Sequence, residues 1–127
     1  MDNFNFTKLV VADLEKSASF YKSVCGLTEQ ARVTSQIAGR AISEILFNPV
    51  APGGATFVLL TFPDTPAPAA GELILGFVTS DIAAFLDRTR AAGGSVAQAI
   101  ESRPEHGVKV AFVRDIEGHL IEVVQLL

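Results

Sequence analysis

Residues 9–27 read LVVADLEKSASFYKSVCGL and contain the signals of a strand end, a helix start and a helix stop. It begins inside a segment, Phe4–Val11, whose aromatic and β-branched residues are typical of a β-strand. Asp13 follows at the position of a helix N-cap, and Gly26 stands where a helix would stop. Between the two, apolar residues recur at helical spacing, at Leu14, Ala18, Tyr21 and Cys25. The stretch therefore predicts a strand followed by a helix.

The same pattern returns 68 positions later, in residues 77–94, FVTSDIAAFLDRTRAAGG. Asp81 takes the place of Asp13, and Gly94 takes the place of Gly26. An apolar stripe again lies between the cap and the stop, at Ile82, Phe85, Leu86 and Thr89. These matches fall where local physical chemistry selects the residue type. They predict that the chain is a duplicated module.

The remainder of each half reads as strands. In the first half the predicted strands are Glu29–Thr34, Arg40–Phe47 and Ala55–Phe62. In the second half, Glu72–Thr79 precedes the helix, and Ser95–Ile100, Val108–Val113 and a closing segment from Leu120 follow it. Two prolines and three alanines make residues 64–71, DTPAPAAG, the predicted linker. Each half thus reads β-α-β-β-β, with module one at residues 4–62 and module two at residues 72–127.

The amino-acid composition argues against several classes of function. Hydrophobic residues make up 49% of the chain and charged residues 19%, which is enough apolar material for a packed core. A net charge of −4 argues against a nucleic-acid partner. The apolar runs are too short to span a membrane, and the N-terminus has no signal-peptide pattern. The single cysteine, Cys25, excludes an internal disulfide and favours a cytoplasmic location.

The paired βαβββ order resembles the vicinal oxygen chelate superfamily, which includes glyoxalase I, bleomycin-resistance proteins, methylmalonyl-CoA epimerase and extradiol dioxygenases. Residues 9–27 are similar to the first strand and helix of that family. Residues 112–125, FVRDIEGHLIEVVQ, are similar to its closing D-P-x-G-x-x-x-E hairpin, with Ile116 in place of the usual proline. The resemblance implies an α+β fold in which two modules form a curved mixed sheet around a cavity, with the helices outside. It also implies a homodimer.

In metal-using members of the family, the first and last strands of each module supply four ligands. The resemblance places these at Phe6, at Val58 or Leu59, at Ile74, and at Glu122. Glu72 lies two residues before Ile74, on the same face of the predicted strand. A catalytic divalent metal usually needs about three protein donors. We therefore predict that no metal or other cofactor is bound, with a divalent metal as the alternative.

Glu122 is a single carboxylate in an apolar strand. Alternation places it with Leu120 and Val124 toward the cavity, and sends Ile121 and Val123 toward the helices. Three interpretations remain open: a neutralised remnant of the metal site, a general base or ligand anchor, or a solvent-facing residue. Lys8 lies on the same face as Phe6. It is expected either to pair with Glu122 or to extend into solvent.

These residues favour a small protein that holds an apolar or aromatic molecule in its cavity. The predicted binding residues are Phe6, Lys8, Val58, Leu59, Glu72 and Ile74, and Glu122 is the candidate catalytic residue. The alternative is a metal-dependent lyase, isomerase or dioxygenase that uses Glu122 and unconventional ligands. A non-catalytic interaction module is a third possibility. His106 is predicted to be exposed in a turn, His119 is predicted to be a surface or turn residue and not a metal ligand, and Cys25 is predicted to be a small buried hydrophobe.

Overall fold

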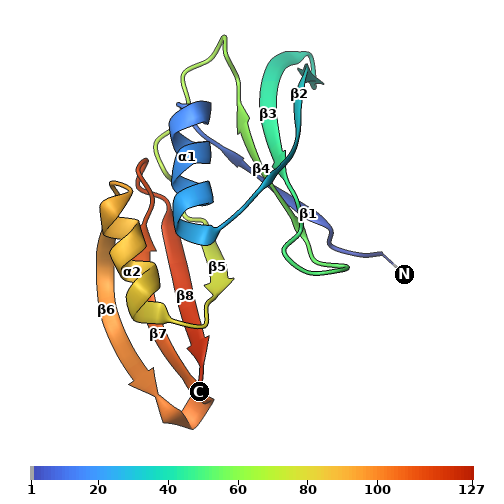
Figure 1. Ribbon diagram of the computed structural model, residues 1–127. Coiled ribbons are helices and arrows are strands. Elements are labelled where there is room, and N and C mark those ends of the chain that lie inside the picture. The colour runs from blue at the N-terminus through green and yellow to red at the C-terminus, as the bar shows by residue number, and fades with distance from the viewer. Residues whose placement is uncertain (1) are drawn as a thin grey trace. The chain divides into compact units, whose positions relative to one another are not determined.

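The computed structural model describes residues 2–127 and consists of two βαβββ modules (Figure 1). By contacts the chain divides into two compact units, residues up to 22 with 26–68, and residues 23–25 with 69–127. The predicted α+β class is confirmed. The elements of the first module are β1 (Phe6–Val10), α1 (Leu14–Cys25), β2 (Glu29–Ile37), β3 (Arg40–Phe47) and β4 (Thr56–Thr61). Those of the second are β5 (Ile74–Val78), α2 (Ile82–Ala91), β6 (Ser95–Arg103), β7 (Val108–Arg114) and β8 (Leu120–Leu126), with a 3₁₀ turn at Pro104–His106.

Both sheets are mixed and have the same strand order. The first runs β1-β4-β3-β2 and the second β5-β8-β7-β6. In each sheet the first strand pairs in parallel with the last strand of its module, and the other neighbours are antiparallel. The duplication therefore extends to strand pairing: Lys8 lies beside Val58 in one sheet, and Gly76 lies beside Glu122 in the other.

The predicted helix signals are confirmed. The side chain of Asp13 accepts a 3.0 Å hydrogen bond from the backbone N–H of Lys16, and Asp81 accepts one of 3.0 Å from Ala84. Gly26 ends α1 in the left-handed conformation, with φ of 68°. No helix within residues 2–127 is long and apolar enough to cross a membrane.

Each helix packs on one face of its own sheet. The ring of Tyr21 in α1 lies 5.0 Å from that of Phe57 in β4, and the ring of Phe77 in β5 lies 6.3 Å from that of Phe85 in α2. Since side chains alternate along a strand, the remaining residues lie on the opposite face, which we call the far face. On β1, β3 and β4 of the first sheet it includes Phe6, Lys8, Val10, Ile42, Glu44, Leu46, Thr56, Val58 and Leu60. On β5, β7 and β8 of the second sheet it includes Ile74, Gly76, Val78, Val110, Phe112, Arg114, Leu120, Glu122 and Val124.

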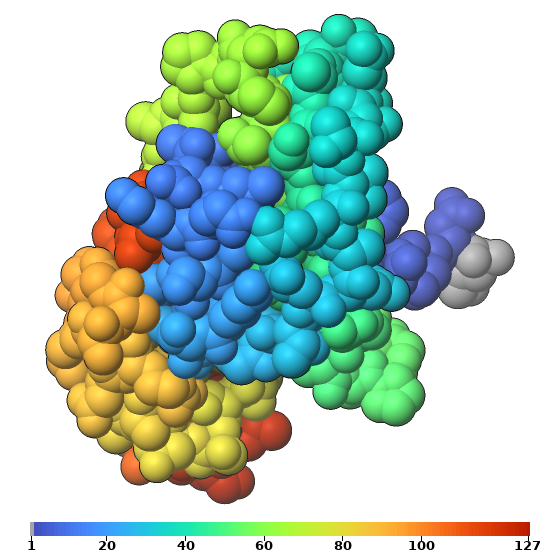
Figure 2. Space-filling view, turned by 45° about the horizontal axis from the view of Figure 1, so that its top comes forward, coloured from blue at the N-terminus to red at the C-terminus, as the bar shows by residue number. Residues whose placement is uncertain are grey.

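Strand β2 is longer than predicted and lies at the surface. It runs to Ile37, three residues past the expected end, because Ala38 and Gly39 adopt the positive φ angles of a tight hairpin turn. All its residues after Glu29 are exposed, and they form the cyan part of the surface in Figure 2.

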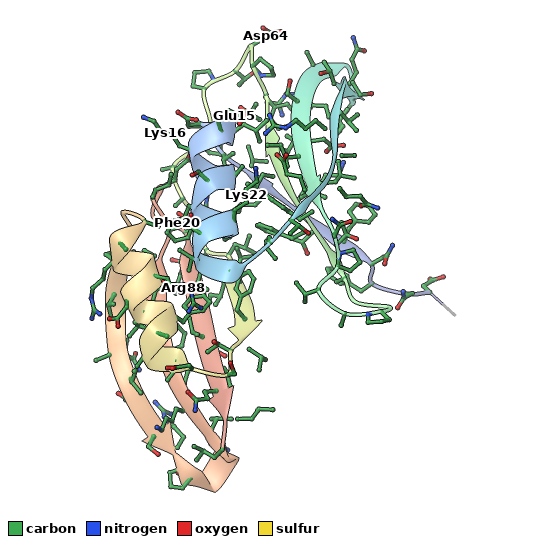
Figure 3. The ribbon with its side chains drawn as sticks, in the orientation of Figure 1. Glu15, Lys16, Phe20, Lys22, Asp64 and Arg88 are labelled. Carbon is green, nitrogen blue, oxygen red and sulfur yellow. The ribbon has the colours of Figure 1, made fainter. Side chains whose placement is uncertain are left out.

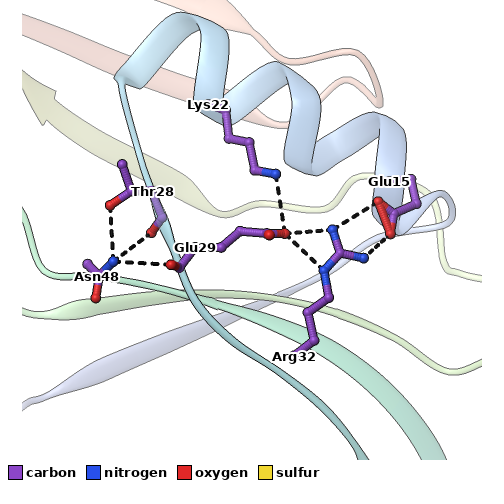
Figure 4. Close-up of polar contacts among 6 residues, drawn as sticks. All are labelled: Glu15, Lys22, Thr28, Glu29, Arg32 and Asn48. Carbon is purple, nitrogen blue, oxygen red and sulfur yellow. Dashed lines mark hydrogen bonds and ion pairs between the residues drawn. The ribbon is translucent and has the colours of Figure 1, made fainter.

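An ion-pair network ties β2 to α1 (Figure 4). Arg32 bonds to the carboxylates of Glu15 and Glu29, and Lys22 lies 3.2 Å from Glu29. The hydrogen bonds from Arg32 hold the pKa of both carboxyl groups below their ordinary range. In Figure 3, Glu15 and Lys22 are labelled along α1.

Candidate functional site

Glu122 occupies the far face of the second sheet. Its cross-strand neighbours are Gly76 on β5 and Phe112 on β7. The flanking residues Ile121 and Val123 point the other way and are completely buried. Glu122 thus faces away from α2, in the direction that alternation predicts, and it is half-buried.

Space is open beside this carboxylate. Gly76 has no side chain, and a Cβ placed there would meet no atom within 4 Å. Within residues 2–127 the carboxylate of Glu122 makes no hydrogen bond or ion pair. An acceptor with unused capacity therefore borders an opening in the sheet surface.

The residues around Glu122 are apolar and accessible. Ile74 is 55% exposed and Val78 is 71% exposed, while Phe112, Leu120 and Val124 are partly exposed. Such a surface can hold an apolar or aromatic body next to one hydrogen-bond acceptor.

The far face of the first sheet carries a partly buried ion pair. The Lys8 ammonium lies 2.9 Å from the Glu44 carboxylate; the side chain of Lys8 is 32% exposed and that of Glu44 only 8%. Ile42, Val58 and Leu60 surround the pair and are buried. The sequence suggested Glu122 as a partner of Lys8. In the structure the partner of Lys8 is Glu44. Glu44 was missed, although it too is a single carboxylate in an apolar strand, RAISEILF.

Three of the four family ligand positions carry a side chain that cannot bind a metal ion. Strand register resolves the second position as Val58, since Val58 pairs with Lys8 as Glu122 pairs with Gly76. Leu59 lies on the helix-packed face and is fully buried. Phe6 and Ile74, the two remaining positions, are hydrocarbon side chains.

Glu72 does not complete a metal site. It is exposed and precedes the first residue of β5, so the strand alternation that would align it with Ile74 does not extend to it. Residues 2–127 contain no group of three His, Cys, Asp or Glu side chains that could hold a metal ion. The donor set therefore does not fit the divalent metal that the family implies.

His119 lies in the turn between β7 and β8, one of the two predicted locations, but it is buried and not at the surface. Its Nδ1 lies 2.8 Å from Oδ2 of Asp115, and both side chains are almost inaccessible. Asp115 also accepts hydrogen bonds from the backbone N–H groups of Glu117 and His119. The tight turn between β7 and β8 brings residues four apart together, so His119 holds the hairpin closed. His106 is exposed, as predicted.

Two other features lie outside these faces. Burial raises the pKa of the Cys25 thiol to about 12, which makes it a poor nucleophile at neutral pH. A cavity of about 670 Å³ is lined by Ala12 and residues 61–67. Asp64, labelled in Figure 3, is the only ionisable residue in that lining.

Comparison with known proteins identifies the family. The paired βαβββ modules form a glyoxalase-like fold. Residues 3–123 match the model of the Glyoxalase/Bleomycin resistance protein/Dioxygenase superfamily, and the chain belongs to this superfamily.

Individual proteins that resemble this chain share only a modest part of its sequence. A probable lactoylglutathione lyase from Vibrio parahaemolyticus is 29% identical over 124 residues, which cover 94% of this chain and 87% of that protein. A glyoxalase family protein from Bacillus cereus has a similar structure, with a TM-score of 0.83 and 19% identity over 97% of this chain and 93% of that one. TioX from a Micromonospora species gives a TM-score of 0.68 and 25% identity over 99% and 100%.

Proposed function

We propose that this protein binds a small apolar or aromatic molecule without a metal ion, and that Glu122 anchors the molecule. The observation that supports this is the unpaired, half-buried carboxylate of Glu122 in an apolar far face, beside the opening at Gly76. A ligand that carries a hydroxyl or N–H group would supply the missing hydrogen-bond donor. Its apolar part would cover Ile74 and Phe112.

A binding experiment tests the proposal. 2-Naphthol is the probe, because it combines an aromatic body with one hydroxyl donor. We expect it to raise the melting temperature of the natural protein and to shift the amide resonances of Gly76 and Glu122. Gly76→Leu places a side chain where an added Cβ would meet no atom within 4 Å, and should weaken binding by about tenfold, or 1.4 kcal/mol. Ala83→Leu, at an exposed position on α2, is the matched control and should bind normally. Equal affinity in both variants would contradict the proposed site.

The second candidate is a metal-dependent lyase. The similarity to the probable lactoylglutathione lyase favours it, and Glu122 and Glu72 would be its ligands. The hydrocarbon side chains at Phe6, Val58 and Ile74 count against it, because they cannot bind a metal. Stoichiometric metal in protein purified without a His-tag would favour this candidate.

We also propose that the protein is a cytoplasmic homodimer. The support is the family membership together with the absence of any cysteine besides Cys25. Light scattering coupled to gel filtration should give twice the 13.5 kDa mass of the chain. A monomeric mass at micromolar concentration would contradict the proposal.

A further inference from the structure

The Lys8–Glu44 pair is a feature that the fold itself does not require. The two modules have the same strand pairing, so each position of one far face has an equivalent in the other. Gly76 is the equivalent of Lys8, and Val110 is the equivalent of Glu44. The second sheet is therefore built with no charge at these two positions.

Stability does not explain the pair either. Glu44 is buried among Ile42, Val58 and Leu60, so its carboxylate has lost most of its hydration. Well-packed apolar residues in place of a buried ion pair are often neutral or stabilising. A charged pair in the middle of an apolar face therefore points to a role in recognition.

Of the two charged groups, the ammonium of Lys8 is accessible to solvent and the carboxylate of Glu44 is not. Glu44 is nearly inaccessible, whereas about a third of the Lys8 side chain reaches the surface. An ammonium group has three donors, and among residues 2–127 the only hydrogen bond of the Lys8 ammonium is the one to Glu44. Its ammonium also lies 5.8 Å from the centre of the Phe6 ring, which is 55% exposed. An accessible cation thus stands beside an accessible aromatic ring.

We propose that Lys8 binds the carboxylate of an aromatic acid, with Phe6 against the aromatic part of the ligand and Glu44 as the residue that positions Lys8. Glu44 limits the freedom of the lysine stem, so less conformational entropy is lost when an anion binds. This inference goes beyond the proposed function, because it assigns to the far face of the first sheet a ligand of its own, an aromatic carboxylate.

Two matched probes test the inference, 1-naphthoate and its neutral analogue 1-naphthamide, titrated into the labelled protein by NMR. Lys8→Met combined with Glu44→Gln removes both charges and leaves no unpaired buried ion. We expect this double variant to bind naphthoate about tenfold more weakly than the natural protein, and to bind naphthamide equally well. Glu44→Gln alone should bind naphthoate more weakly and naphthamide equally well, because the stem of Lys8 is no longer held in place. Lys16→Met, at an exposed lysine on α1, should change nothing.

The outcomes separate the two proposals. If naphthamide binds, and naphthoate binds the natural protein and the double variant equally, the inference about Lys8 is overturned and the proposed function stands. If 2-naphthol binds and naphthoate does not, the inference is overturned and the proposed function stands. If naphthoate binds through Lys8 and 2-naphthol does not bind, the inference is supported and the proposed function fails. A loss of naphthoate binding in the double variant, with naphthamide binding unchanged, supports the inference.

Discussion

At the scale of single residues, each far face contains a carboxylate in an apolar strand, and the two differ in their partners. Glu44 is almost completely buried and pairs with Lys8. Glu122 is half-buried and, within residues 2–127, has no partner. The free energy of a buried charge depends on whether a counter-charge compensates the lost hydration. Substitutions at the two sites should therefore have different effects on stability.

Removal of the Lys8 charge should lower the free energy of unfolding more than removal of the Glu44 charge does. Lys8→Met leaves Glu44 buried and uncompensated, and should lower the free energy of unfolding by about 2–4 kcal/mol. Glu44→Gln should cost about 1 kcal/mol, since the partly exposed ammonium can turn toward water. Urea denaturation of both variants measures this. Equal losses would mean that the carboxylate is better hydrated than its 8% exposure indicates.

Glu122→Gln should have little effect on stability or increase it. The change removes a charge that is half-buried without compensation, and the amide keeps nearly the same shape. We expect the free energy of unfolding to remain unchanged or to rise by up to about 1 kcal/mol. Glu105→Gln, in an exposed turn, is the control. A loss of more than about 1 kcal/mol would show that Glu122 makes a stabilising contact.

At the scale of elements, the two helices begin in the same way. Asp13 and Asp81 each accept a 3.0 Å hydrogen bond from the backbone N–H three residues later. Asp13→Ala and Asp81→Ala should each lower the free energy of unfolding by about 1 kcal/mol, and Asn at either position should recover most of it. A negligible effect at one cap would mean that this helix start is held by packing alone.

The network around Arg32 should make the attachment of β2 to α1 sensitive to acid. Arg32 lowers the pKa of Glu15 and Glu29 from their ordinary value of 4.5. A carboxyl group with a lowered pKa in the folded state stabilises that state above its ordinary pKa, and the effect is lost as pH falls through the lowered pKa. The melting temperature of the natural protein should therefore fall more steeply below pH 4.5 than that of Arg32→Met.

The comparison needs a matched surface variant, and Arg90→Met serves because Arg90 pairs only within an exposed turn of α2. Salt should reduce the difference between the natural protein and Arg32→Met, since all the groups involved are at the surface. If Arg32→Met and Arg90→Met show the same acid profile, the network does not contribute to stability.

At the scale of the whole molecule, local signals predicted the fold well. Asp13, Gly26 and Asp81 are selected by helix ends, which depend only on neighbouring residues, and all three act as predicted. Contacts between residues distant in sequence were harder to predict. The sequence could not decide between Val58 and Leu59, because strand register is set by the partner strand. The Lys8–Glu44 pair joins residues 36 positions apart, and its only signal was a carboxylate in an apolar run.

The side chains at the four family ligand positions predict that the protein binds no stoichiometric metal ion. Carried over from the family, the four ligand positions are Phe6, Val58, Ile74 and Glu122, and only the last can donate to a metal. One carboxylate, with any additional ligands from water, gives too few protein donors for a stable zinc, nickel, manganese or iron site. Elemental analysis of protein purified without a His-tag should therefore find far less than one metal ion per chain. Added zinc or a chelator should leave the melting temperature unchanged, because a site that binds only the folded state would raise it. A stoichiometric metal that is lost in Glu122→Gln would overturn this prediction and favour the lyase.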